Sequence, residues 1–350
     1  MTGAGAVGVS TVLVAMSGGV DSSVAAALLL EEGHEVVGVT MKLWGGDSDT
    51  GCCSVSDVDD ARRVAHQLGI SHHVFNFTEG FQREVVDPYV RAHAEGRTPN
   101  PCIECNRHLK FDRLLERATR LGIDQVATGH HARVVEGHVA RGADRAKDQS
   151  YVVHMLRGDA LARVRFPVGS ITKDEVRAHA ARLGLRTAGK PDSQDVCFIT
   201  RSGRATFLSE RIPLHEGRVV DAGGVVVGAV PAVELVTVGQ RRGLGLPGGH
   251  AQHHAVAVDV PGRTVTVGPV EALLRESLQI ERVVWAGEPF AGDVLAQCSA
   301  HGAVRRAAVE PSADGAVLRW ATLQPAVAPG QSVVLYDLAD ERVLAGGLAT

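Results

Sequence analysis

Val12-Leu-Val-Ala-Met16 is followed by Ser17-Gly-Gly-Val-Asp-Ser-Ser23 and then by a helical run to Glu32, and this stretch indicates the class of fold. The apolar run predicts a buried strand, the glycines a tight turn, and Asp21–Glu32 a helix. Strand, glycine turn and helix N-terminus together form an anion site, because unpaired amides and the positive helix end face outward. The simpler alternative is that Asp21 or Ser22 only caps the helix.

Short β-branched runs and amphipathic runs alternate through the first half of the chain. This alternation predicts parallel βαβ units in an α/β doubly wound parallel sheet, whose ligands bind at the carboxyl ends of the strands. Pro88 predicts a kink or an interruption of the expected helix Phe81–His93. Beyond the first strand and helix, the expected strands are Glu35–Met41, His72–Phe77 and Gln125–Thr128, and the expected helices are Asp57–Leu68, Phe81–His93 and Ile103–Leu121.

From about Arg218 onward the helical periodicity disappears. Short apolar runs are separated there by turn sequences such as Asp221-Ala-Gly-Gly224, which predicts an all-β region. We expect an α/β catalytic domain over residues 1–205, a central small β domain over 206–278 and a C-terminal β-barrel domain over 279–350.

Composition constrains the cellular setting. Apolar residues make up 45% and charged residues 22% of the chain, and no run of about eighteen apolar residues is present to span a bilayer. Six cysteines in 350 residues are too few for a disulfide scaffold. We expect a cytoplasmic protein with no membrane contact. The net charge of −4 does not by itself indicate a nucleic-acid partner.

The loop Ser17–Ser22 resembles the S-G-G-x-D-S signature of the ATP pyrophosphatase family and lacks the Gly-Lys-Ser/Thr of a Walker loop. Enzymes of that family cleave ATP between the α and β phosphates and adenylate an oxygen of their substrate. The resemblance implies bound ATP with Mg²⁺, and it says nothing about the acceptor.

Further motifs in order along the chain resemble those of bacterial tRNA-specific 2-thiouridylases, a branch of that superfamily. The resemblance extends from about Thr11 to the C-terminus. The matching stretches are Arg97-Thr-Pro-Asn-Pro-Cys102-Ile-Glu-Cys105-Asn106, Ala127-Thr-Gly-His130, Lys147-Asp-Gln-Ser-Tyr151, Lys190-Pro-Asp-Ser193 with Val196-Cys197-Phe198-Ile199, Gly239-Gln-Arg-Arg-Gly-Leu-Gly245, and Pro329-Gly330-Gln331.

The resemblance implies a role for each matching position. Cys105 is the implied nucleophile and Cys197 the implied persulfide carrier. Implied ATP contacts are Ala15, Met16, Ser17, Gly18, Gly19, Val20, Asp21, Ser22, Met41 and Gly129. Implied tRNA contacts are Asn100, Pro101, Cys102, His130, Lys147, Asp148, Gln149 and Gln331.

The implied reaction agrees with the chemistry of these residue types. A uridine carbonyl oxygen is a poor leaving group, so ATP must first convert it into an adenylate. A cysteine persulfide carries deliverable sulfur, and a second thiolate releases it and leaves a disulfide. We expect Cys105 near the start of the helix through Lys110 and Phe111, where the helix end lowers a thiol pKa.

Other arrangements of the cysteines stay open. One alternative is that Cys102 and Cys105 form half of a zinc site, and another is that they form a redox pair, although the sequence offers no convincing further ligands or redox context. Together with Cys197 they are also a candidate iron–sulfur site with one open iron. Some family members carry an aspartate at the position of Cys102, so an acid–base role there is in doubt. Cys52 and Cys53 are expected to be incidental, and Cys298 a small buried apolar residue.

The partners implied are the anticodon loop of a tRNA with a wobble uridine, and a sulfur-donor protein or cysteine desulfurase. We expect a monomer. Two rival functions are another adenylating ligase of the superfamily, which does not need Cys105 and Cys197, and a non-catalytic nucleotide-binding or redox-sensing module, which does not release AMP.

Overall fold

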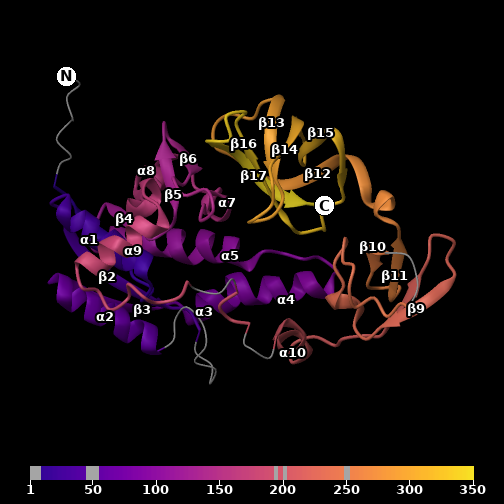
Figure 1. The fold of residues 1–350 in the computed structure, drawn as a ribbon, viewed down its shortest axis with the longest axis horizontal. Helices are drawn as coiled ribbons and strands as arrows, with labels where there is room; N and C mark the ends of the chain where they lie inside the picture. The colour runs from indigo at the N-terminus through magenta and orange to yellow at the C-terminus, as the bar shows by residue number, and fades with distance from the viewer. Residues whose placement is uncertain (1–8, 45–54, 193–195, 200–202, 248–252) are drawn as a thin grey trace. The chain divides into compact units, whose positions relative to one another are not determined.

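The structure, a computed structural model, describes residues 9–44, 55–192, 196–199, 203–247 and 253–350 (Figure 1). Cys52, Cys53 and Ser193 lie outside these ranges. The chain forms two compact units. The first consists of the residues up to Gln82 together with Glu104–Phe198, and the second of Arg83–Ile103 together with Ile199–Thr350.

The first unit is built on a five-stranded parallel sheet with strand order β3-β2-β1-β4-β7. Because β2 and β4 flank β1 on opposite sides, the chain reverses its direction of winding between β1 and β4. The carboxyl ends on either side of such a reversal are where doubly wound sheets bind ligands. The strands are β1 (Thr11–Ala15), β2 (Glu35–Lys42), β3 (Ser71–Asn76), β4 (Gln125–Thr128) and β7 (Val164–Arg165), and a hairpin is formed by β5 (Ala132–Val135) and β6 (His138–Arg141).

Part of the helical layer packs on this sheet through an apolar cluster. Buried side chains of β1, α1, α2 and α9 form a single cluster, with Val14, Val24, Val64 and Val176 among the fully buried members. The removal of these apolar side chains from water is the main contribution to the stability of the sheet. The helices of the unit are α1 (Val20–Glu31), α2 (Val55–Leu68), α3 (Thr78–Phe81), η2 (Cys105–Arg113), α6 (Leu114–Arg120), α7 (Ser150–Val153), α8 (Gly158–Ala162), η3 (Pro167–Ser170) and α9 (Lys173–Arg182).

Two helical runs contain π-helical stretches. The first passes through η1 (Gln82–Val86) into α4 (Asp87–Ala94), so Pro88 does not break the helix as an interruption requires. Pro88 has no backbone N–H to donate to the carbonyl one turn earlier, and the helix there has the wider π-helical turns of η1. The second run begins at Pro101 with α5 (Pro101–Glu104) and continues through η2 and α6.

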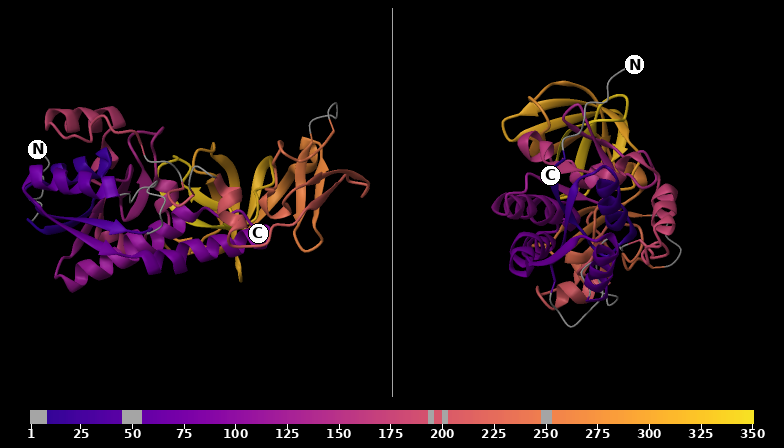
Figure 2. Two further views of the ribbon diagram at one scale, coloured as in Figure 1. Left: turned by 90° about the horizontal axis from the view of Figure 1, so that it is seen from below. Right: turned by 90° about the vertical axis from the view of Figure 1, so that its left-hand side faces the viewer.

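The second unit contains two β structures, as expected from the sequence. The central one has strand order β10-β11-β8-β9, and the other is a closed six-stranded barrel, yellow in Figure 2. Residues that pack inside the barrel include Val294, Val309, Leu318 and Leu335. The elements are α10 (Gly203–Ser209), β8 (Gly217–Val220), β9 (Val226–Val230), η4 (Val233–Leu235), β10 (His254–Asp259), β11 (Thr264–Gly268), η5 (Val270–Leu273), β12 (Leu274–Trp285), β13 (Gly292–Gln297), β14 (Arg305–Ser312), β15 (Gly315–Pro325), β16 (Ser332–Tyr336) and β17 (Val343–Ala349).

The expected fold class is therefore confirmed: a doubly wound parallel sheet precedes a small β domain and a β barrel. The strands and helices that the sequence predicted agree with the observed ones to within about three residues at their ends, and the sequence did not predict the elements from β5 to α9. The sequence did not indicate that Arg83–Ile103 packs with the second unit. Within the described residues, no helix is both long and apolar enough to cross a membrane.

Candidate active site

The glycine loop follows β1 at the carboxyl edge of the sheet, where the sequence predicts an anion site. The hydroxyls of Ser22 and Ser23 donate to the carbonyl of Gly19 at 3.2 and 2.8 Å, so they shape the loop themselves. Gly18 has φ of +75°, and a Cβ there would lie 2.2 Å from the backbone oxygen of Asp57. Only glycine meets both constraints, which fixes the loop against α2.

The same edge holds the other residues of the predicted ATP set. Gly129 follows β4, and a Cβ on it would lie 2.5 Å from the backbone nitrogen of Ser22. Met41 lies at the carboxyl end of β2, beside β1. The structure thus brings together at one sheet edge Ala15, Met16, Ser17, Gly18, Gly19, Val20, Asp21, Ser22, Met41 and Gly129.

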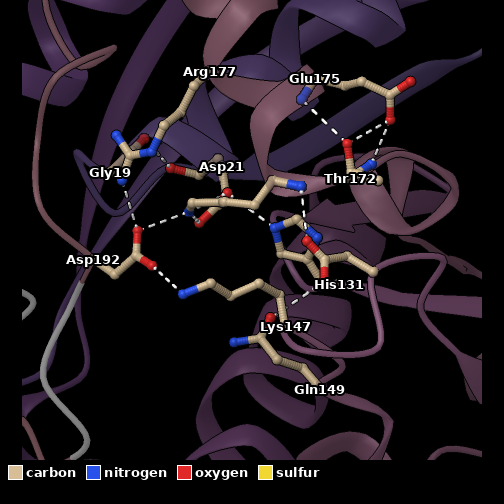
Figure 3. A network of polar contacts seen from close by, with 12 residues as sticks. Gly19, Asp21, His131, Lys147, Gln149, Thr172, Glu175, Arg177 and Asp192 are labelled. Carbon is tan, nitrogen blue, oxygen red and sulfur yellow. Dashed lines mark hydrogen bonds and ion pairs between the residues drawn. The ribbon is translucent and has the colours of Figure 1, made fainter.

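Asp21, in the first turn of α1, is held by two basic side chains. Lys173 Nζ donates to both carboxylate oxygens at 2.7 Å, and His131 Nε2 lies 3.0 Å from Oδ1. Burial would raise the pKa of the Asp21 carboxyl, but the hydrogen bonds from His131 and Lys173 outweigh it and hold the pKa below its ordinary value. Asp21 is therefore ionised, and its two partners fix the orientation of its carboxylate. Figure 3 shows Asp21 beside His131.

Lys173 owes its place to a helix start that the sequence encodes locally. Thr172 caps α9: its hydroxyl accepts from the backbone of Glu175, and the Glu175 side chain accepts from the backbone of Thr172 at 2.6 Å. This reciprocal capping box satisfies two amides and fixes the first turn. Helix α9 comes after β7, which is a strand of the same sheet as β1. Its first residue, Lys173, therefore reaches the sheet edge where Asp21 lies.

A second carboxylate, Asp192, collects three cationic side chains at this site. Its Oδ1 lies 2.9 Å from Lys173 Nζ and accepts from Arg177 at 3.0 Å, and its Oδ2 accepts from Lys147 Nζ at 2.8 Å. Burial would raise the pKa of Asp192, but the bonds from Lys147 and Lys173 lower it to about 2. Figure 3 shows Asp192 between Arg177 and Lys147. Lys147, Lys173 and Arg177 thus surround one anion, the carboxylate of Asp192.

The predicted tRNA contacts of the first unit have structural partners of their own. His130 is buried; its Nδ1 lies 2.7 Å from Thr128 Oγ1, and its ring packs near Phe111 and Phe166. Burial, and then the charge of Lys110, hold the pKa of His130 well below its ordinary value, so the ring is neutral. A contact from this ring to RNA requires it to leave this packing.

The loop Lys147–Gln149 divides between structure and surface. Asp148 is nearly buried and accepts from Arg141, from the amide of Gly142 and from Ser150, each at 2.8 Å. Gln149 exchanges two hydrogen bonds with the backbone of His131, each at 2.8 Å. Only Lys147 is exposed, so it alone presents a charged side chain to solvent.

The remaining predicted tRNA contacts belong to the second unit. Asn100 caps the helix that begins at Pro101, because its Oδ1 accepts from the amide of Cys102 at 3.0 Å. Gln331 donates from its side-chain amide to the carbonyl of Thr98. The amide of Thr98 donates to the carbonyl of Pro329 at 2.8 Å. The segment that precedes the helix therefore contacts the barrel turn Pro329–Gln331.

The two candidate catalytic cysteines both lie in the first unit. Cys105 is buried at the start of the π-helical stretch η2, and Cys197 is half-buried in a turn. The helical run begins at Pro101, so Cys105 lies about one turn beyond its start and is the first residue of η2. π-Helical turns are frequent at functional sites.

The described residues include no group of three or more His, Cys, Asp or Glu side chains placed to hold a metal ion. Cys298, expected to be a small buried apolar residue, is partly buried just beyond β13 and packs against the barrel core, where burial raises the pKa of its thiol to about 11.

Sequence reasoning missed His131 and Lys173, and it carried Asp192 only inside a motif. Two local signals point to the first two. His131 follows the end of β4 beside His130, and Thr172-Lys-Asp-Glu175 has the form of a capping box. That these residues meet Asp21 depends on the strand order.

Three family profiles match consecutive parts of the chain. They are described as a tRNA methyl transferase HUP domain, over residues 10–201, a tRNA methyl transferase PRC-barrel domain, over 205–269, and an aminomethyltransferase beta-barrel domain, over 275–349. Fold and site thus define a protein with a HUP-type domain carrying an ATP-pyrophosphatase-like loop, followed by two β domains.

Relatives identify the branch. The tRNA-specific 2-thiouridylase MnmA of Mycobacteroides abscessus is 46% identical over 354 residues, which cover 97% of this chain and 99% of that protein. The protein of the same name from Roseiflexus sp. (strain RS-1) is 45% identical over 370 residues, covering 96% and 98%. The chain belongs to the tRNA-specific 2-thiouridylase family.

Proposed function

We propose that this protein is a tRNA-uridine 2-sulfurtransferase that replaces the C2 oxygen of a wobble uridine by sulfur and consumes ATP. The observation that carries the proposal is the phosphate loop Ser17–Ser22 at the point of strand reversal, in the same unit as Cys105 and Cys197. The full-length likeness to proteins named tRNA-specific 2-thiouridylase supports the choice of acceptor and product.

The first step uses the glycine loop. ATP enters as its Mg²⁺ complex, so the metal ion arrives with the substrate. The amides of Gly18 and Gly19 and the positive end of α1 receive the phosphates. The uridine C2 oxygen attacks the α phosphate, pyrophosphate leaves, and the oxygen becomes part of an adenylate. This activation is needed because a carbonyl oxygen is otherwise too poor a leaving group.

The second step uses the two cysteines. A donor protein places a sulfur atom on Cys197 as a persulfide. The thiolate of Cys105 attacks the inner sulfur, which forms a Cys105–Cys197 disulfide and releases hydrosulfide. Hydrosulfide attacks C2 of the adenylated uridine, and AMP leaves with the former C2 oxygen. A thiol reductant then supplies two electrons that reopen the disulfide before the next turnover.

Partners and compartment follow from this chemistry. The substrates are ATP and the anticodon loop of a tRNA, whose wobble base must be unstacked to be reached. A cysteine desulfurase or a sulfur-carrier protein supplies the persulfide. The cytoplasm provides all of these together with reducing thiols. We propose a monomer as the active form, which light scattering with and without tRNA tests.

Methyl transfer is the second candidate, since two of the matching family profiles carry that description. The chemistry of the site argues against it. Methyl transfer from a sulfonium donor needs neither an adenylate nor a pair of cysteines, whereas the S-G-G-x-D-S loop serves ATP cleavage. The two candidates give nucleosides of different mass, so one digest of the product distinguishes them.

The test supplies purified protein with unmodified tRNA, Mg-ATP and a cysteine desulfurase with free cysteine, under anaerobic conditions. Mass spectrometry of the digested tRNA should find 2-thiouridine, and AMP should form in equal amount. Cys105→Ser and Cys197→Ser should lose the product, while Cys298→Ser, a matched change inside the barrel, should retain it. AMP without a modified nucleoside would mean a different acceptor, and a methylated uridine would replace this proposal.

A further inference from the structure

Three cationic side chains converge on the carboxylate of Asp192, which lies between Arg177 and Lys147 in Figure 3. Lys173 Nζ lies 2.9 Å from its Oδ1, Arg177 donates to the same oxygen at 3.0 Å, and Lys147 donates to Oδ2 at 2.8 Å. Asp144, a further carboxylate at the start of α9, instead accepts from the backbone amide of Lys173 at 3.1 Å. Asp192 thus supplies one negative charge to three positive ones.

Two of the three cations are held in place by partners other than Asp192. Arg177 also donates from Nη1 to two backbone carbonyls, at 2.7 and 3.1 Å. Lys173 also donates to both carboxylate oxygens of Asp21, at 2.7 Å. Removal of the Asp192 carboxylate would therefore leave both donors where they are. Donors that are fixed in advance bind an incoming anion without the cost of ordering them.

The carboxylate of Asp192 is accessible to exchange. Its side chain is 39% exposed, that of Lys147 is 45% exposed and that of Arg177 is 33% exposed, whereas Lys173 forms the buried side of the cluster. Ion pairs that are open to solvent contribute little net stability. A dissolved anion of higher charge can therefore replace Asp192 without unfolding of the surrounding sheet and helices.

The cation cluster is continuous with the phosphate loop. Lys173 Nζ bridges Asp192 to Asp21, and Asp21 lies in the first turn of α1, directly after the loop glycines. Lys190 Nζ donates to the carbonyl of Gly18 at 3.0 Å and to two carboxylates of α2 at 2.6 and 2.7 Å. These bonds use all three donors of the ammonium group, so Lys190 ties the loop to α2 and is not a ligand for an incoming anion.

We propose that Lys147, Lys173 and Arg177 form a binding site for the pyrophosphate group of ATP, and that Asp192 occupies this site as an internal competitor until the nucleotide binds. This inference rests on the proposed function. A pyrophosphate group carries more charge than a carboxylate and has oxygens enough for all three cations, and guanidinium groups suit phosphate oxygens well. After the adenylate forms, the return of Asp192 to the cations favours release of inorganic pyrophosphate. No covalent bond to Asp192 forms or breaks.

The test is calorimetric titration of the full chain with Mg-ATP, with Mg-pyrophosphate and with AMP. Asp192→Asn removes the competing charge and keeps the shape of the side chain. It should bind Mg-ATP and Mg-pyrophosphate about tenfold more tightly than the wild type, which is the factor that one hydrogen bond to a charged group is worth. AMP lacks the pyrophosphate group and should bind with unchanged affinity.

Lys147→Gln is the matched comparison, because it breaks the same ion pair from the other side. Lys147 is a ligand in this proposal, so the variant should bind Mg-ATP and Mg-pyrophosphate about tenfold more weakly. An ion pair with a structural role alone predicts that both variants change the affinity in the same direction. Asp174→Asn removes an exposed carboxylate next to Lys173 on α9, outside the cluster, and should bind as the wild type does. Thermal melting shows which variants are folded, and Asp192→Ser takes the place of Asp192→Asn if that variant is not.

The outcomes identify the anion and separate the two proposals. A shift with Mg-ATP alone assigns the site to the bound nucleotide, and one with Mg-pyrophosphate alone assigns it to the product. Unchanged or weaker binding of both by Asp192→Asn overturns the competitor role. Tighter binding of unmodified tRNA by that variant, with both other affinities unchanged, assigns the cations to an RNA phosphate and also overturns it. A wild type that forms no 2-thiouridine, with the opposite shifts still present, means that only the proposed acceptor is wrong.

Discussion

Lys173 and Asp21, 152 positions apart in the sequence, form a paired contact in which Nζ donates to both carboxylate oxygens at 2.7 Å. Lys173 is the first residue of α9, and Asp21 lies in the first turn of α1. Two helix starts that each favour an anion are therefore joined by one ion pair. The pair holds Asp21 in place at the end of the phosphate loop. Asp192 is the second carboxylate that contacts Lys173.

Lys173→Met should lower the rate of tRNA-dependent AMP formation about 100-fold, which is typical of removing one charged group from a preorganised site. Asp21 would keep only His131, and Asp192 would lose one of its three cations. AMP release measured by chromatography checks this. The matched control is Arg182→Gln on the same helix, which breaks an exposed pair with Glu31 and a surface contact with His179 and should leave the rate unchanged. An unaffected Lys173→Met enzyme would remove this lysine from the site.

Gly129→Ala should abolish ATP binding at concentrations that saturate the wild type. The added Cβ would lie 2.5 Å from the amide nitrogen of Ser22, and neither backbone can yield without moving the start of α1. Overpacking of this kind also costs about 1–3 kcal/mol of unfolding free energy. Calorimetric titration and urea unfolding test both effects. Gly189→Ala, which meets no atom within 4 Å, is the control and should bind ATP normally.

Gln331→Glu separates two roles for this side chain. A carboxylate cannot donate to the carbonyl of Thr98, so we expect the second unit to lose about 1 kcal/mol of unfolding free energy and the enzyme to lose kcat. A residue that only contacts tRNA would instead raise KM for tRNA at unchanged stability. Urea unfolding and steady-state kinetics measured on the same preparation distinguish the two. Gln324→Glu, a glutamine of the same barrel whose side-chain amide donates to nearby Thr322, is the control.

Cys102→Ser should retain 2-thiouridine formation from a persulfide source within a fewfold of the wild type. In the persulfide route only Cys105 and Cys197 exchange sulfur, whereas a three-cysteine iron–sulfur cluster needs Cys102 as a ligand. Iron content and visible absorbance of anaerobically purified protein accompany the rate measurement. A brown wild-type protein that loses both iron and activity in Cys102→Ser would favour the cluster over the disulfide route.

Acid should destabilise the unit that holds His154. Burial lowers the pKa of His154 to about 4, and the ring is 4% exposed. Below about pH 6.5 the unfolded chain binds a proton that the folded ring refuses, so stability is full above that pH and falls towards pH 4. We expect a loss of about 1–2 kcal/mol between pH 7 and pH 5 from this group. Urea unfolding of His154→Gln should show a correspondingly smaller loss; an equal loss would contradict the assignment.

Sequence reasoning was most successful where the signal was local. Strand, glycine turn and helix are contiguous around Ser17–Ser22, and the loop forms where it was expected. The helix around Cys105 begins at Pro101, two residues before the predicted start, because Asn100 and Pro101 begin it and the apolar periodicity does not report that pair. His131 was missed although it also follows β4, because only the tertiary structure shows that its ring reaches Asp21.

The sequence by itself determined the class of fold, the phosphate loop, the cysteine segments and the family, since each depends on neighbouring residues or on motifs in order. Only the tertiary structure decided that Lys173, His131 and Asp192 surround the loop, and that Lys190 reaches Gly18. The contacts of Lys173 and His131 with Asp21, and of Lys190 with Gly18, join residues more than a hundred positions apart. They exist because the strand order β3-β2-β1-β4-β7 places the carboxyl ends of β1, β4 and β7 at one edge, and periodicity along a single chain carries no record of that order.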